Sequence, residues 1–197
     1  MPEAAPGPQI VEAYKTYLPP FNAAKTVRLL LRYVPPQYVA GLKTIVLTNQ
    51  QAMSHDQRRR KLWSRRRKVP MNRVRGRYFQ AWKGNPAWIE LFVDKIITDD
   101  FFSRMAMRIP LARAVGVGEV LYHEIGHHIH KTQRPEYRER EDVADDWDPK
   151  MGRTFLRTRY WYLIPLLKLI VGIYHLTTKS GLSRKSPGTK AGSLPAQ

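Results

Sequence analysis

The chain contains no cysteine in its 197 residues. This absence excludes disulfide-stapled folds, metal sites with cysteine ligands, iron–sulfur clusters and thiol nucleophiles. Acidic residues are scarce too, since 34 lysines and arginines outnumber 16 aspartates and glutamates and leave a formal net charge of +18. A charge of this size predicts attraction to phosphate groups or to anionic lipid, although it carries no information about the fold.

Long hydrophobic runs are also missing. The most apolar stretch, 160–176, is interrupted by Lys168 and falls short of the about 20 apolar residues with which a helix spans a membrane. Residues 1–20 lack the basic start and the apolar centre of a secretory signal. We therefore expect a cytoplasmic protein, either free or peripheral to a membrane.

Composition divides the chain into consecutive parts. Residues 1–21 are rich in proline and alanine and are expected to form an N-terminal arm. A single domain is expected over 22–150, with a basic insertion at 54–77, and a basic and apolar helix is expected over 151–177. Residues 178–197 are rich in serine, glycine, proline and lysine, which predicts a disordered tail.

Apolar spacing and turn residues predict an α+β fold for the domain. The first helix is expected to end at Pro35, and Asp148 with Pro149 is expected to end the last one. Turn residues between two aromatic and β-branched runs predict a hairpin. The predicted elements are helices over 22–34, 111–130 and 136–147, a strand over 43–48, and a hairpin over 76–93.

The most informative residues are His123, Glu124 and His127, which form the motif HExxH on the second of these helices. Residues four apart lie on one face of a helix, so the two imidazoles can point at one metal ion, with Glu124 close to a water beside it. The alternative is a helix end that is merely rich in histidine. The opposite face is apolar at every fourth residue, which predicts packing in a core: Val117, Leu121, Ile125 and Ile129.

A catalytic zinc ion needs a third protein ligand and one open position. His130 lies two helical turns, about 10 Å, from His123 along the axis, which is too far for one ion on a straight helix. The segment 136–148 holds seven of the 16 acidic residues. In so basic a chain, this local concentration of negative charge predicts that the segment binds a cation.

Within this acidic segment Glu141 is the expected third ligand. Asp145 lies on the same helical face and is expected to accept the other ring N–H of His123, which fixes the tautomer of that histidine. Two alternatives stay open: an acidic face that is only solvated, and a rival pair of carboxylates, Asp142 and Asp146.

The residues HEIGHHIH followed by EDVADDW resemble the zincin metallopeptidases, in the gluzincin branch that combines HExxH with a downstream ExxxD. The short interval between His127 and Glu141, together with the pattern E-x-x-A-D, is similar to compact bacterial zincins such as the ImmA/IrrE family. The resemblance covers 22–147. It implies a zincin-like α+β core with a small mixed sheet and an active-site helix, to which this chain adds a C-terminal helix.

The resemblance implies a zinc-dependent peptidase that hydrolyses peptide bonds in protein or peptide substrates. One Zn²⁺ would be held by His123, His127 and Glu141, with Glu124 as the general base. An extended substrate is expected to add as a strand along 87–93. Three residues are candidate donors to the oxyanion, with no choice among them: Tyr137, Arg157 and Tyr160.

A second function is suggested by the basic insertion, which cannot pack in a core and is expected to be a long exposed loop or an exposed helix. Three interpretations stay open: a solvated loop without a partner, a nucleic-acid site in which Trp63 stacks on a base, and a site for anionic membrane. The candidate phosphate-binding residues are Arg58, Arg59, Arg60, Lys61, Arg65, Arg66, Arg67 and Lys68.

The alternative to a peptidase is therefore a protein that binds nucleic acid or a membrane surface and carries a non-catalytic zincin site. The stretch 160–176 adds to this alternative, because it is flanked by arginines and lysines and can cover the core, lie on a membrane surface or span a membrane. The oligomeric state does not follow from the sequence.

Overall fold

The computed structural model describes residues 7–64, 67–97, 105–133, 140–163 and 165. The chain divides into two units, Met1–Leu156 and Arg157–Gln197, and each is described by itself. The first unit contains the sheet and the helix with the HExxH motif. The described part of the second unit consists of the end of α6 (Arg140–Arg159) and the short helix η4 (Trp161–Leu163).

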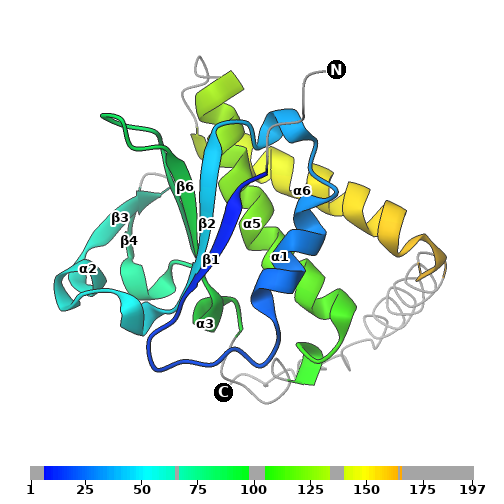
Figure 1. Ribbon diagram of the computed structural model, residues 1–197, viewed down its shortest axis with the longest axis horizontal. Coiled ribbons are helices and arrows are strands. Elements are labelled where there is room, and N and C mark those ends of the chain that lie inside the picture. The colour runs from blue at the N-terminus through cyan, green and yellow to red at the C-terminus, as the bar shows by residue number, and fades with distance from the viewer. Residues whose placement is uncertain (1–6, 65–66, 98–104, 134–139, 164, 166–197) are drawn as a thin grey trace, which may run out of the picture. The chain divides into compact units, whose positions relative to one another are not determined.

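A four-stranded sheet forms the centre of the first unit (Figure 1). Counted across the sheet, the first three strands run parallel to one another, and the fourth, at the edge, runs antiparallel to its neighbour. The sheet is therefore small and mixed, which is compatible with an α+β fold and with the small mixed sheet that the family resemblance implies. In their order across the sheet, the strands are β1 (Gln9–Ala13), β2 (Leu42–Thr48), β6 (Ala87–Phe92) and β5 (Gly76–Phe79).

The strand β1 corrects the prediction that residues 1–21 form an arm. It pairs with β2 from Gln9 opposite Thr44 to Ala13 opposite Thr48. The Asn49 side chain fixes the chain after the strand, because its Oδ1 accepts from Lys15 N–H and its Nδ2 donates to the Lys15 carbonyl, both at 2.8 Å. An edge strand stays partly exposed and needs no clear apolar alternation, which is why its sequence did not reveal it.

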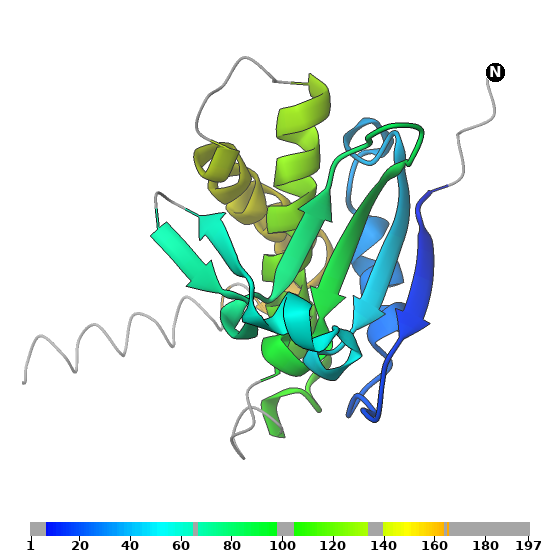
Figure 2. The same cartoon turned by 90° about the vertical axis from the view of Figure 1, so that its left-hand side faces the viewer.

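Two helices pack against one face of this sheet (Figure 2). Helix α1 (Ala23–Leu31) begins at Asn22, whose side chain accepts a hydrogen bond from Lys25 N–H at 2.7 Å. Helix α5 (Pro110–Gln133) carries the HExxH motif. The apolar back predicted for this helix is confirmed, because Val117, Leu121, Ile125 and Ile129 are all buried.

Helix α6 is longer than the sequence predicts. It continues through Pro149, so the predicted end at this residue is wrong. A proline inside a helix costs about 3 kcal/mol, because it removes one backbone hydrogen bond. Beyond Pro149, however, Met151 and Phe155 are buried, and the Phe155 ring packs edge-on against Tyr33 with the centroids 5.2 Å apart. This packing offsets the cost, and the helix predicted over 151–177 begins inside α6.

The basic insertion 54–77 is predicted to be a long exposed loop or an exposed helix, and among its described residues it holds an exposed α-helix only at its start. It contains the short helix α2 (His55–Arg59) and an antiparallel hairpin of β3 (Lys61–Ser64) and β4 (Arg67–Pro70). A 3-10 helix, η3 (Met71–Arg73), leads back to the sheet, where Met71 is buried with Met53 and Phe92. This small cluster anchors a segment in which most described basic side chains are exposed, as predicted, whereas Arg77 is half-buried.

The hairpin predicted over 76–93 is confirmed as β5 and β6, although β5 ends at Phe79. Lys83 and Gly84 have φ values of 47° and 83°, which suit the tight turn at its tip. Strand β6 pairs with β2 on one side and β5 on the other. The prediction that a substrate adds along 87–93 is therefore wrong, because this strand has no free edge.

The remaining short elements connect these parts. They are η1 (Pro36–Tyr38), η2 (Gln50–Ala52) and α3 (Val93–Ile96). Within the described ranges, no helix has both the length and the apolar composition required to cross a membrane. The predicted tail 178–197 and most of the stretch 160–176 lie outside the described residues, so the predictions for them stay predictions.

Candidate metal centre

The front of α5 presents His123 and His127 one helical turn apart. Their rings meet edge to face, with centroids separated by 4.7 Å. Both side chains are half-buried, whereas Ile125 and Ile129 on the back of the helix are fully buried. The packed back thus fixes the helix against the sheet and leaves the two imidazoles at the front.

Helix α6 reaches this front because two small residues meet where it crosses α5. A Cβ atom added at Gly126 would lie 2.6 Å from the Ala144 Cα and 3.1 Å from the Ala144 carbonyl oxygen. Ala144 is itself completely buried. Glycine inside a helix costs about 1 kcal/mol relative to alanine. Here it allows the two helix backbones to touch, beside the histidine pair.

Glu141 lies one helical turn before Ala144 on the same side of α6, and the close crossing brings it to the histidines. Its Oε2 is 3.6 Å from the Nε2 of His123. One ligand atom each from His123, His127 and Glu141 lie within 4.8 Å of one another. A tetrahedral ion with bonds of about 2.0–2.2 Å separates its ligands by about 3.3–3.6 Å. These three residues can therefore bind one metal ion.

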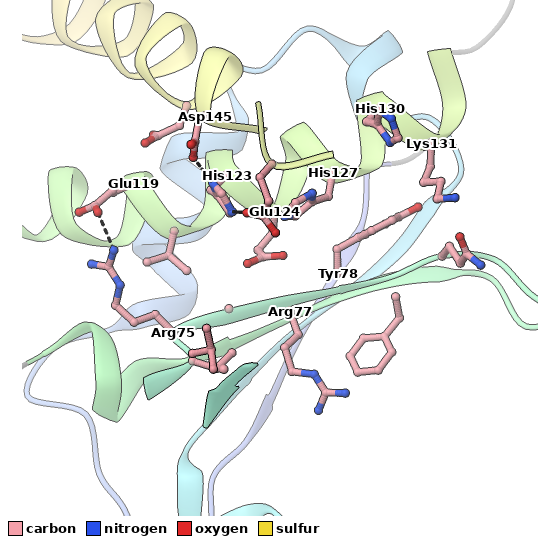
Figure 3. A pocket seen from close by; sticks show the side chains of 18 of the residues that line it. Arg75, Arg77, Tyr78, Glu119, His123, Glu124, His127, His130, Lys131 and Asp145 are labelled. Atoms are coloured by element: carbon pink, nitrogen blue, oxygen red, sulfur yellow. Dashed lines mark hydrogen bonds and ion pairs between the residues drawn. The ribbon is translucent and has the colours of Figure 1, made fainter. Parts of the chain in front are cut away.

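Asp145 lies one turn further along α6 and faces the other nitrogen of the same imidazole. Its Oδ1 is 3.4 Å from the Nδ1 of His123, as the predicted helical face requires (Figure 3). A carboxylate in this position orients a metal-binding histidine and raises its basicity. The rival carboxylates, Asp142 and Asp146, are exposed and do not join the group of three.

Glu124 is buried between α5 and β5, with an exposed fraction of 5%. A Cβ added at Gly76 would lie 2.7 Å from Glu124 Oε1 and 2.7 Å from a methyl carbon of Val120, so the glycine leaves the space that this carboxylate occupies. Burial raises the pKa of Glu124 to about 7, an effect that His123 opposes and Glu141 reinforces. A carboxylate with this pKa can accept and release a proton near neutral pH.

The two histidines differ in protonation. Burial lowers the pKa of His127 to about 4, and the neighbouring His123 acts in the same direction. Burial also acts to lower the pKa of His123, but the Glu141 hydrogen bond and the nearby carboxylates outweigh it and raise this pKa. The carboxylates thus favour positive charge at His123, while His127 stays in the neutral form that binds metals.

The centre lies in a cleft of about 800 Å³ between α5, α6 and β5. Figure 3 shows Arg75 reaching across it to Glu119 on α5, a contact of 2.6 Å. We name its two sides by the elements that form them. The helix wall consists of Glu119, Val120, His123, Glu124, His127, His130, Lys131, Glu141, Asp145 and Asp148, and the strand wall consists of Val69 and residues 73–80.

Sequence reasoning missed a link between the two walls. The hydroxyl of Tyr78 lies 3.1 Å from Nδ1 of His128, and Nε2 of this buried histidine lies 2.9 Å from the Ala40 carbonyl. Since a carbonyl only accepts, Nε2 donates to Ala40 and Nδ1 accepts from Tyr78. His128 therefore ties β5 to α5. No pattern in the sequence separates it from its neighbouring histidines.

The described part of the first unit does not test the roles predicted for the other site residues. Tyr137, Arg65 and Arg66 lie outside the described residues, and Arg157 and Tyr160 belong to the second unit. The roles predicted for them stay predictions. Comparison of the chain with protein-family models, with curated proteins and with solved structures finds no match.

Proposed function

We propose that the protein is a zinc-dependent metallopeptidase of the zincin kind, which hydrolyses peptide bonds of protein or peptide substrates. One observation carries the proposal: His123 and His127 from one helix meet Glu141 from a second helix inside an open cleft. Glu124 lies in the same cleft. A structural or lapsed metal site has no need of Glu124, so its presence favours the peptidase over a pure binding protein.

Zinc fits this donor set. Two imidazole nitrogens and one carboxylate oxygen, with a fourth position open, are the usual protein ligands of a catalytic zinc ion. Asp145 beside His123 adds the carboxylate that commonly supports such a ligand. When bound, zinc lowers the pKa of a water molecule towards neutrality and polarises a carbonyl group.

The protein's own residues supply the proton transfers and the orientation. Glu124 accepts a proton from the attacking water and gives it to the leaving amine, a role that suits a buried carboxyl group whose pKa is about 7. His127 stays neutral, and Asp145 holds the ring of His123 in place. Tyr137, Arg157 and Tyr160 remain the candidates for stabilising the oxyanion.

The first test measures zinc and peptide hydrolysis in the same preparations. Elemental analysis of the purified protein is expected to find about one zinc ion per chain, as in a mononuclear catalytic site. Glu124→Gln is expected to retain the zinc and to lower cleavage of unfolded casein about 10²- to 10⁴-fold, the range of general acid–base catalysis. Glu12→Gln, the same change at an exposed position of β1 that does not line the cleft, is the matched control and is expected to leave cleavage nearly unchanged.

A second variant locates the ion. His127→Ala is expected to lose both zinc and hydrolysis, whereas His55→Ala, at an exposed histidine of α2, is expected to lose neither. Equal turnover of Glu124→Gln and the unchanged protein would remove Glu124 from the mechanism. A zinc-loaded protein that cleaves neither casein nor a mixed peptide library would overturn the proposal.

A further inference from the structure

The basic insertion carries a group of cations that make no ion pair with an acidic side chain in the described part of the chain. Arg58, Arg59, Arg60 and Lys61 are consecutive and exposed, and Arg73 on η3 is exposed as well. Met71 N–H donates to the Arg60 carbonyl at 3.3 Å, so η3 lies against the end of α2. We name these five side chains, Arg58 to Lys61 with Arg73, the basic patch.

Two nearby arginines, unlike those of the basic patch, form ion pairs with glutamates. Arg75 pairs with Glu119 at 2.6 Å, and Arg77 pairs with Glu90 at 3.6 Å. Within the described part of the chain, no residue of the basic patch makes such a pair. The basic patch therefore keeps its full charge available to an external anion, and four of its five cations are arginines, whose planar forks bind phosphate oxygens in pairs.

Helix α2 does not have the composition of a helix that binds a lipid surface. A helix that binds a membrane surface buries an apolar face in it. Helix α2 has five residues and none is buried against the protein, and its sequence HDQRR offers no apolar face to lipid. Among the described side chains, the large exposed hydrophobic residues all lie outside 54–77.

An exposed aromatic ring lies at the tip of the β5–β6 hairpin. Trp82, at the turn after β5, is 64% exposed, with Lys83 Nζ 5.9 Å from its ring centroid. The Phe79 ring is not available in the same way, because Trp88 stacks on it at 3.9 Å and Arg77 lies 4.5 Å from its centroid. Trp82 thus offers a ring on which a planar base can stack, next to a cation.

We propose that the basic patch and Trp82 bind single-stranded nucleic acid, with phosphates on the basic patch and an unpaired base on Trp82. Arginine-rich surfaces combined with exposed aromatic rings are the usual means of binding single strands without sequence preference. The edge strand β5 lies between Arg73 and Trp82 in the sequence, and the chain joining these two residues spans at most about 30 Å if extended. This inference does not depend on the proposed peptidase activity.

The first experiment measures binding of a fluorescent oligonucleotide of 20 thymidines to the full chain across a salt series. Affinity is expected to fall steeply with salt, since each phosphate contact to a single strand contributes about 0.7 to the logarithmic slope. The triple variant Arg58→Gln, Arg59→Gln, Arg60→Gln is expected to reduce this slope by about 2. The matched control, Lys25→Gln, Arg28→Gln, Arg32→Gln at exposed positions of α1 and its C-cap, is expected to leave the slope unchanged.

The second experiment isolates the stacking. Trp82→Ala is expected to weaken binding about 5- to 150-fold at constant salt slope, the effect of one stacked base. Trp82→Phe, which keeps a ring, is expected to recover most of the affinity. Trp161→Ala, at a tryptophan that is 68% exposed, is the control and is expected to have no effect.

Four results would overturn the proposal. They are no binding of the oligonucleotide at low salt, equal slopes for the two triple variants, equal affinity for Trp82→Ala and the unchanged protein, and equal affinity for a 20-base-pair duplex. Vesicles of phosphatidylcholine and phosphatidylserine test the other anionic partner. If the basic-patch variant loses vesicle binding and keeps oligonucleotide binding, the partner is anionic lipid and the proposal fails.

Discussion

The two walls of the cleft are positioned by different kinds of contact. The helix wall depends on a backbone contact, because Gly126 and Ala144 let α5 and α6 touch. The strand wall depends on side-chain contacts, namely Arg75 with Glu119 and Tyr78 with His128. A backbone contact tolerates little change, whereas a side chain can move aside. We therefore expect substitutions on the helix wall to affect metal binding most strongly, and those on the strand wall to affect it less.

The largest effect is expected from Gly126→Ala. The new Cβ would meet the backbone of Ala144 at 2.6 Å, so the helices must separate and Glu141 must withdraw from the histidines. Overpacking of this kind lowers the free energy of unfolding by about 1–3 kcal/mol, and zinc affinity is expected to fall with it. Urea unfolding and zinc competition with a chelator measure the two effects.

Gly152 on α6 provides the control for Gly126→Ala. It is also helical, but a Cβ added there would meet nothing within 4 Å. Gly152→Ala is therefore expected to raise the free energy of unfolding, by up to about 1 kcal/mol, through helix propensity alone. Equal effects of the two variants would show that the crossing does not require glycine.

A smaller effect is expected from Asp145→Asn. The change keeps the size of the side chain but removes the charge that faces Nδ1 of His123. Loss of such a supporting carboxylate typically lowers metal affinity about 10- to 100-fold. Chelator competition measures it, with the exposed Asp146→Asn as control. The same affinity in both variants would argue against an orienting role for Asp145.

On the strand wall, Gly76→Ala is expected to cost about 1 kcal/mol of unfolding free energy, because the atoms in its way belong to the movable side chains of Glu124 and Val120. Zinc is expected to remain bound, while casein cleavage falls because the Glu124 carboxylate is displaced. Gly7→Ala, where a Cβ meets nothing within 4 Å, is the control. Loss of zinc in Gly76→Ala would contradict the expected independence of the two walls.

The smallest effect concerns pH. Burial, with help from Glu119 and Asp145, raises the pKa of Asp148 to about 6. A carboxyl group whose pKa is higher in the folded state binds its proton more tightly there, so the free energy of unfolding falls as pH rises from about 4 to about 6. In metal-free protein, Asp148→Asn is expected to remove this part of the pH dependence, amounting to less than about 1 kcal/mol for a group near the surface. Thermal unfolding at pH 4 and pH 7 tests it.

Sequence reasoning was most successful where geometry is local. The spacing of His123 and His127 places two side chains on one helical face whatever the rest of the chain does. The same argument holds for Glu141 and Asp145 on α6, and the apolar back of α5 follows from its period. These predictions needed only the helix repeat, and the structure places all four side chains together.

The predictions that were wrong depended on partners far away in the sequence. Strand β1 forms because residues 9–13 pair with the edge of β2, and the sequence of these five residues alone does not predict a strand. Helix α6 continues past Pro149 because Phe155, later in the same helix, packs against Tyr33. The one overlooked local clue was Gly126 itself, since a glycine in the middle of a helix often marks a close approach of another backbone.

The Gly126–Ala144 crossing also changes how the sequence pattern itself is defined. If helix contact is what carries the carboxylate to the histidines, then these two small residues belong to the pattern as much as the ligands do. A search for H-E-x-G-H followed by E-x-x-A-D would then select chains able to assemble this centre, and would reject HExxH helices whose bulkier fourth residue keeps a second helix away. In chains that do assemble it, positions 126 and 144 are expected to vary only as a pair.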